Sequence, residues 1–132
     1  MKKVIFLIAS FLIVSISYAQ VSYLQYRHVP SDKEQEFLEK ETQYWSKVAK
    51  AAIDKGAMSG WALWRKVSVT ASDAPNYVFV NTFSSIDKID QAAVWSEENI
   101  KKMGVSPDMV ETNSFTTVSF DYWMQLEDTV QG

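Results

Sequence analysis

The chain alternates strand-like and helix-like segments in an order that few folds accommodate. Runs rich in aromatic and β-branched residues, each bounded by turn residues, predict four strands, at residues 23–29, 61–69, 77–83 and 115–126. One helix-like segment separates the first strand from the second, and another separates the third from the fourth. This βαββαβ order predicts an α+β domain with a four-stranded antiparallel sheet and two helices on one face.

Both predicted helices have recognisable ends. The first begins at the capping-box sequence Ser31–Glu34 and stops at Gly56, a residue that readily adopts the left-handed conformation. The second begins after Ser84 or Ser85 and stops at Gly104. In each helix, apolar residues recur at helical spacing, so one face of each is expected to pack on the sheet.

The strand at 77–83 carries apolar side chains on both of its faces. Tyr77, Phe79 and Phe83 point to one side, and Val78 and Val80 point to the other. Since both helices are expected on a single face of the sheet, the opposite face needs a cover of its own. We expect a second copy of the chain to provide it, so that two sheets pack together in a homodimer.

The first 19 residues have the pattern of a secretory signal peptide. Lys2 and Lys3 precede an apolar run from Val4 to Ile16, and Ser17-Tyr18-Ala19 offers small residues where signal peptidase cleaves. This run of about 13 residues is shorter than the roughly 20 that span a bilayer, which argues against the alternative of an uncleaved anchor. We therefore expect a single mature domain, residues 20–132, that is periplasmic or secreted and free of the membrane.

Composition restricts the partners and cofactors. Loss of Lys2 and Lys3 from the 13 basic residues leaves 11 against 16 acidic ones, and a net charge of about −5 does not suit nucleic acid. The chain has one histidine and no cysteine, so we expect no transition-metal site. No phosphate-binding loop or Ser-His-Asp pattern is present, and we expect no cofactor. Acidic residues of the helices, among them Glu36 and Glu41, are expected on solvated surfaces.

The stretch from Tyr77 to Asp90 (YVFVNTFSSIDKID) is an aromatic and β-branched strand that turns into a helix. It is similar to the corresponding stretch of the dimeric α/β-barrel superfamily, which includes stress-responsive barrel proteins and antibiotic-biosynthesis monooxygenases. The long first helix with Trp45, followed by Gly56, fits the same pattern. The resemblance covers nearly all of residues 20–132 and implies a ferredoxin-like fold. It also implies that two subunits pack sheet to sheet, each enclosing a ligand cavity.

The resemblance leaves the activity open. The superfamily includes monooxygenases, haem-degrading enzymes, cyclases, decarboxylating peroxidases and proteins that only bind ligands. Its haem-degrading members carry an axial histidine on the second helix, where this chain has Asn99, Lys101, Lys102 and Met103. Haem degradation is therefore not expected.

Five residues are candidates for a ligand site. His28, the single histidine, has the pKa range of a general acid or base, and the alternative is a strand-end histidine without a chemical role. Asn81 is polar within an apolar strand, so its amide must bind either a ligand or another part of the protein. Tyr26, Trp64 and Tyr77 complete the expected lining, and the alternative for the tryptophan is plain packing. A register shift of one residue would turn each strand side chain to the opposite face.

Three functions are compatible with these features. The first is an exported dimeric protein that binds a small apolar or aromatic molecule, which agrees with the many aromatic residues and the missing catalytic pattern. The second is a cofactor-independent monooxygenase or cyclase acting on an aromatic or polyketide-like substrate, since such a substrate supplies much of the chemistry. The third is a structural role through the sheet dimer. The sequence favours the first.

Overall fold

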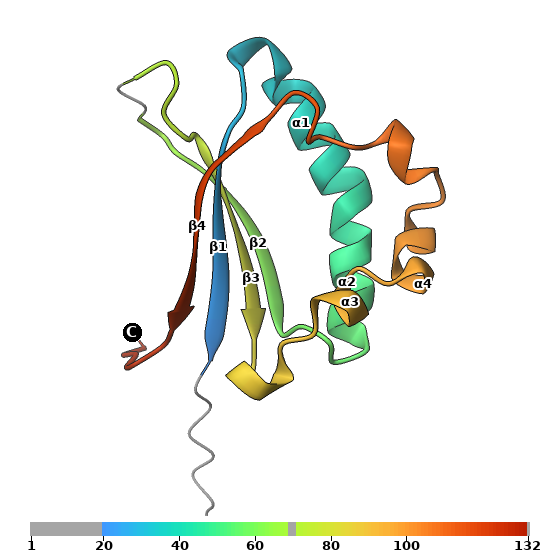
Figure 1. Ribbon diagram of the computed structural model, residues 1–132, viewed down its shortest axis with the longest axis vertical. Coiled ribbons are helices and arrows are strands. Elements are labelled where there is room, and N and C mark those ends of the chain that lie inside the picture. The colour runs from blue at the N-terminus through green and yellow to red at the C-terminus, as the bar shows by residue number, and fades with distance from the viewer. Residues whose placement is uncertain (1–19, 69–70, 132) are drawn as a thin grey trace, which may run out of the picture.

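A four-stranded antiparallel sheet carries the helical segments on one of its faces (Figure 1). The computed structural model describes residues 20–68 and 71–131, and the predicted signal peptide, residues 1–19, lies outside them. The sheet has the order β2-β3-β1-β4. Its strands are β1 (Val21–His28), β2 (Gly60–Arg65), β3 (Tyr77–Phe83) and β4 (Thr117–Gln125). This arrangement confirms the predicted ferredoxin-like α+β fold.

The first helical segment is one long run of helix with a wider π-helical turn in its middle. A 3₁₀ turn at Ser31–Lys33 leads into α1 (Glu34–Lys40), a π-helical turn covers Glu41–Trp45, and α2 (Ser46–Asp54) completes the run. The run ends as predicted, because Gly56 has a φ of +75°. Its start differs from the predicted capping box. Ser31 makes no capping hydrogen bond there.

The second helical segment consists of short pieces rather than the one continuous helix that the sequence predicts. Its two α-helical pieces are α3 (Gln91–Val94) and α4 (Glu97–Ile100), and 3₁₀ turns cover Ile86–Lys88, Lys101–Met103 and Pro107–Met109.

Two internal helix caps explain why this second helical segment is divided. The Asp90 carboxylate accepts the backbone N–H of Ala93 at 3.0 Å, and the Ser96 hydroxyl accepts that of Asn99 at 3.2 Å. Each cap begins a new helix and interrupts the one before it, because short polar side chains compete for backbone groups. Gly104, with a φ of +75°, ends the run of α4 and the 3₁₀ turn Lys101–Met103, where the sequence predicts the end of the helix.

The two faces of the sheet have different environments. On the helix-facing side, Tyr77, Phe79, Asn81 and Phe83 of β3 are all buried. The opposite face, called the outer face below, is formed by the alternate residues of each strand. Its large side chains are apolar, and those with the greatest exposure are Trp64 of β2 and Phe120, Tyr122 and Met124 of β4. Apolar side chains therefore occupy both faces, as the sequence predicts.

Replacing Gly56 with alanine tests the end of the first helical run. At a φ of +75° a Cβ atom is strained even though the surrounding space is open, so we expect Gly56→Ala to lower the free energy of unfolding by about 1 kcal/mol. Gly60→Ala is the matched control, because its Cβ would lie at an ordinary 3.5 Å from the Thr82 Cβ. Urea denaturation measures both, and equal stability of the two variants would contradict the assignment.

Candidate functional site

A cavity of about 530 Å³ lies between the helix-facing side of the sheet and the helical layer. Its walls come from β1, β2, β3 and β4, from the π-helical turn, from the region of α3, and from the connection that precedes β4. This volume is within the range of sites for small organic molecules. The cavity is therefore the candidate site, and the chemistry of its walls defines what it can bind.

Aromatic rings form much of the cavity wall. Trp45 and Trp95 meet edge to face, with ring centroids 6.2 Å apart, and Trp61 lies at the same distance from Phe79. Trp123 of β4 adds a fourth indole at the cavity. The rings offer flat apolar surface against which another planar or aliphatic body can pack.

A row of hydrogen-bonded polar side chains crosses the sheet beneath the cavity. Tyr23, Gln25 and Arg27 alternate along β1, so all three face the helices. The Tyr23 hydroxyl donates to Asp121 Oδ2 of β4 at 2.6 Å, and Gln25 Nε2 donates to the Tyr23 oxygen at 3.3 Å. Arg27 holds Gln25 Oε1 through Nε at 2.9 Å and Nη2 at 2.7 Å.

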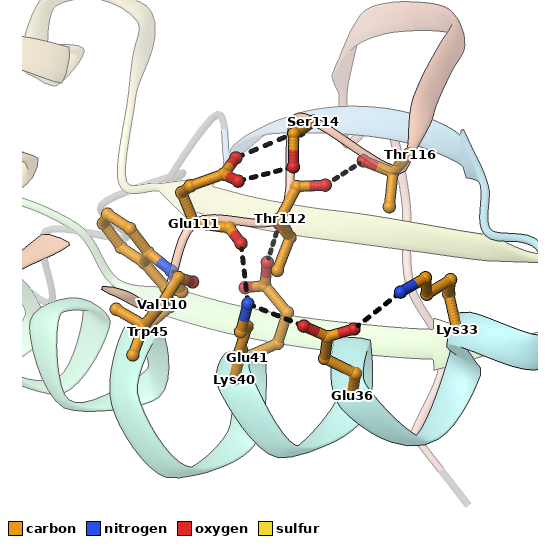
Figure 2. A network of polar contacts seen from close by, with 10 residues as sticks. All are labelled: Lys33, Glu36, Lys40, Glu41, Trp45, Val110, Glu111, Thr112, Ser114 and Thr116. Atoms are coloured by element: carbon orange, nitrogen blue, oxygen red, sulfur yellow. Dashed lines mark hydrogen bonds and ion pairs between the residues drawn. The ribbon is translucent and has the colours of Figure 1, made fainter. Parts of the chain in front are cut away.

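The row continues from the sheet to the helix through a threonine. Arg27 Nη1 donates to Thr112 Oγ1 at 3.2 Å, and Thr112 donates in turn to Glu41 Oε1 at 2.7 Å. Figure 2 shows the Glu41 and Thr112 side chains pointing toward each other between the helix and the connection. One hydrogen-bonded chain thus joins β4, β1, the connection and the π-helical turn.

Glu41 is a buried carboxylate, contrary to the predicted solvated surface. Only 5% of the residue is exposed. The sequence spacing does indicate this burial, because Glu41 lies four residues after Phe37 and seven before Val48, on the apolar side of the helix. Burial raises the pKa of Glu41, and the Thr112 hydrogen bond and the Arg27 charge oppose this shift. A carboxylate so placed is suited to exchanging a proton with a molecule in the cavity.

Burial also shifts the pKa values of Arg27 and Tyr23 in the polar row. It lowers the pKa of Arg27, an effect opposed mainly by the charge of Glu41. Arg27 stays charged because a guanidinium titrates far above neutral pH. Burial and the hydrogen bond to Asp121 raise the pKa of Tyr23, so its hydroxyl keeps its proton and acts as a donor.

Asn81 presents an unsatisfied acceptor at the cavity. The residue is 7% exposed, and its Oδ1 has no hydrogen-bond partner among the described residues. A buried polar atom without a partner costs about 1–3 kcal/mol in stability. Its position in the cavity wall makes this atom available to a donor on a bound molecule.

The connection before β4 is held to the helix by polar contacts (Figure 2). The Trp45 indole Nε1 donates to the Val110 carbonyl oxygen at 2.8 Å, and Lys40 Nζ donates to the Glu111 carbonyl oxygen at 3.3 Å. With the Thr112–Glu41 bond, these contacts place Glu111 and Thr112 in the cavity wall. The π-helical turn therefore supplies two anchors for the connection, Glu41 and Trp45.

Of the five predicted site residues, two face the helices. Asn81 lines the cavity. Tyr77 is 1% exposed and packs in the core, with its ring centroid 4.8 Å from that of Phe37.

The other three predicted residues lie away from the cavity. Tyr26 and Trp64 belong to the outer face, where Tyr26 packs against Phe120 at a centroid distance of 4.6 Å. His28 is at the end of β1, with Nδ1 at 3.0 Å from the Ala74 carbonyl oxygen. The structure thus divides the five between the two faces and does not bring them together.

Sequence reasoning missed the polar row. Tyr23, Gln25 and Arg27 have a visible signal, since polar groups at every second position of a strand share one face. The alternation does not reveal which face they share. Thr112 and Asp121 gave no local signal, because their roles depend on pairing with residues far away in the sequence.

Comparison of the chain with protein-family models, curated proteins and solved structures finds no significant match. The fold and the cavity define a ferredoxin-like α+β protein with a site of small-molecule size. Within residues 20–68 and 71–131, no cluster of His, Asp or Glu is suited to holding a metal ion. No helix in the described part of the chain is both long and apolar enough to cross a membrane.

Replacing Glu41 with glutamine tests the burial of its charge. Because the folded state raises the pKa of Glu41 above 4.5, the protonated carboxyl group stabilises the folded state relative to the ionised one. This stabilisation is lost as the pH rises through the folded pKa. We expect the Tm of Glu41→Gln, relative to the unmodified protein, to rise as the pH increases above 4.5 and through the folded pKa of Glu41.

Glu36→Gln is the control for this titration. The Lys40 hydrogen bond lowers the pKa of Glu36 below 4.5, so the relative Tm of this variant should fall as the pH rises through the lowered pKa to about 4.5 and stay level above that. Thermal unfolding followed by circular dichroism measures both variants. A pH-independent difference for Glu41→Gln would show that its carboxylate is not buried in solution.

Proposed function

We propose that this protein binds a small organic molecule in the cavity between the sheet and the helices. The unpartnered Asn81 Oδ1 carries the proposal, because a folded protein seldom leaves a buried acceptor unsatisfied unless another molecule completes it. The aromatic wall supports an apolar or aromatic body for that molecule. The polar row below supports a defined orientation, because Tyr23, Gln25 and Arg27 are already fixed by hydrogen bonds.

A second candidate is a cofactor-independent monooxygenase or cyclase. The specific observation in its favour is Glu41, a buried carboxylate of raised pKa at the cavity, located on a π-helical turn. Such turns are frequent at functional sites. In this function Glu41 would take a proton from an acidic C–H or O–H of the substrate. Substrate-dependent oxygen uptake that Glu41→Gln abolishes, with binding retained, would establish it.

The same proposal includes export and a homodimer. The charged start and short apolar run of residues 2–19 support export. The outer face supports the dimer, because its described strand positions carry no Asp, Glu, Lys or Arg and contribute apolar groups from all four strands. A neutral face of this kind is complementary to a copy of itself and is unlike a surface adapted to water.

Replacing Asn81 with leucine separates binding from folding. Because Oδ1 has no partner, we expect Asn81→Leu to change the free energy of unfolding by less than about 1 kcal/mol, or to raise it. Native mass spectrometry of the purified protein should show a bound small molecule in the unmodified chain and its loss in the variant.

Asn99→Leu is the matched control. This buried amide donates to the Ala93 and Val94 carbonyl oxygens, each at 3.0 Å, and accepts from Lys55 at 2.8 Å. Its loss should cost about 2 kcal/mol or more. If Asn81→Leu were equally destabilising and kept the bound molecule, the cavity would not be the binding site.

A charge on the outer face tests the homodimer. Light scattering of the mature protein should give about twice the mass of one chain. Tyr122→Lys places like charges together across a two-fold interface, so it should yield a folded monomer. Met109→Lys is the control, because Met109 is also well exposed but lies on the helical side. A folded, soluble monomer of the unmodified chain at micromolar concentration would exclude the sheet dimer.

A further inference from the structure

The charges around the cavity are unequal in number. Three carboxylates line it, those of Glu41, Glu111 and Asp121, against the single guanidinium of Arg27. No lysine or arginine among the described residues forms an ion pair with any of the three. The cavity therefore has an excess of negative charge.

The one positive group is already engaged. Arg27 directs its Nε and Nη2 to Gln25 and its Nη1 to Thr112, and its guanidinium carbon lies 4.9 Å above the centre of the Phe79 ring. Through Thr112 it is coupled to Glu41, whose charge it offsets. Three of the five N–H donors of Arg27 therefore serve the protein's own hydrogen bonds, and a bound anion would also meet the remaining carboxylates.

Of the remaining carboxylates, Asp121 is the better placed for a ligand. Glu111 accepts hydrogen bonds from the backbone N–H and the hydroxyl of Ser114, so it is committed to its own turn. Asp121 accepts the Tyr23 hydroxyl through Oδ2 and lies on β4, beside Trp123. A carboxylate next to an indole face is a combination that attracts an organic cation.

Asn81 independently indicates that the ligand carries a cationic hydrogen-bond donor. Its unpartnered Oδ1, in a residue that is 7% exposed, needs a hydrogen-bond donor. A protonated amine provides N–H donors and positive charge together. A carboxylate ligand would provide neither, and an alcohol would provide a donor without charge.

We propose that the ligand of this cavity is a small organic amine, bound as its primary or secondary ammonium ion. Its ammonium group donates to Asn81 Oδ1 and is attracted by the cavity carboxylates, among which Asp121 keeps one oxygen without a hydrogen bond to another described residue, and its apolar body lies against Trp45, Trp61 and Trp95. This inference rests on the proposed ligand-binding function and deepens it by naming the chemical class.

Three probes with the same aromatic body and different charge test the inference. Isothermal titration calorimetry of the full mature protein at neutral pH compares 2-phenylethylamine, 2-phenylethanol and 3-phenylpropionate. We expect the amine to bind at least about tenfold more tightly than the alcohol, and the carboxylate to give no measurable binding. Equal affinities, or tighter binding of the alcohol or the carboxylate, would overturn the amine class.

Variants locate the effect and separate the two proposals. Asp121→Asn should weaken the amine about tenfold and leave the alcohol unchanged. Asp128→Asn removes the same charge from an exposed residue beyond β4 and should change neither. If charge discrimination is absent but Asn81→Leu still abolishes binding, the amine inference fails and the cavity remains the ligand site. If Asn81→Leu leaves the binding of every probe unchanged, both fail.

Discussion

A buried carboxylate on the helix and a half-buried guanidinium on the sheet determine how the helix, the sheet and the connection before β4 fit together. Glu41 and Arg27 belong to different layers, and neither is stable there without hydrogen-bonding partners. Thr112 supplies the bridge between them, since it accepts from one and donates to the other. The connection before β4 must therefore pass between the helix and the sheet at this point, where hydrogen bonds from Trp45 and Lys40 and the burial of Val110 also hold it.

This polar bridge divides the apolar core. One cluster gathers around Phe37 and Tyr77, a second around Ala52 and Phe83, and a third around Val48 and Val110. The region between them holds polar side chains and the cavity rather than packed hydrocarbon. The clusters hold the helices on the sheet while the cavity among them stays open.

The sequence predicted most of the architecture and little of the site, for a physical reason. Strand β3 was predicted with its observed bounds, because aromatic and β-branched alternation is a local property. Gly56 and Gly104 were equally local signals. The apolar spacing of the second helical segment predicts one continuous helix. Asp90 and Ser96 divide it, because each side chain caps a new helix. The polar row joins residues up to 98 positions apart, and no local pattern encodes such a pairing.

The way in which the connection is attached affects how easily this part of the cavity wall can unfold locally. Residues 110–112 are fixed by hydrogen bonds to Trp45, Lys40 and Glu41 and by the burial of Val110 and Thr112. Moving this segment aside would leave Glu41 and Arg27 without their bridge, so the opened state is unfavourable and short-lived. This part of the cavity wall is therefore expected to be rigid.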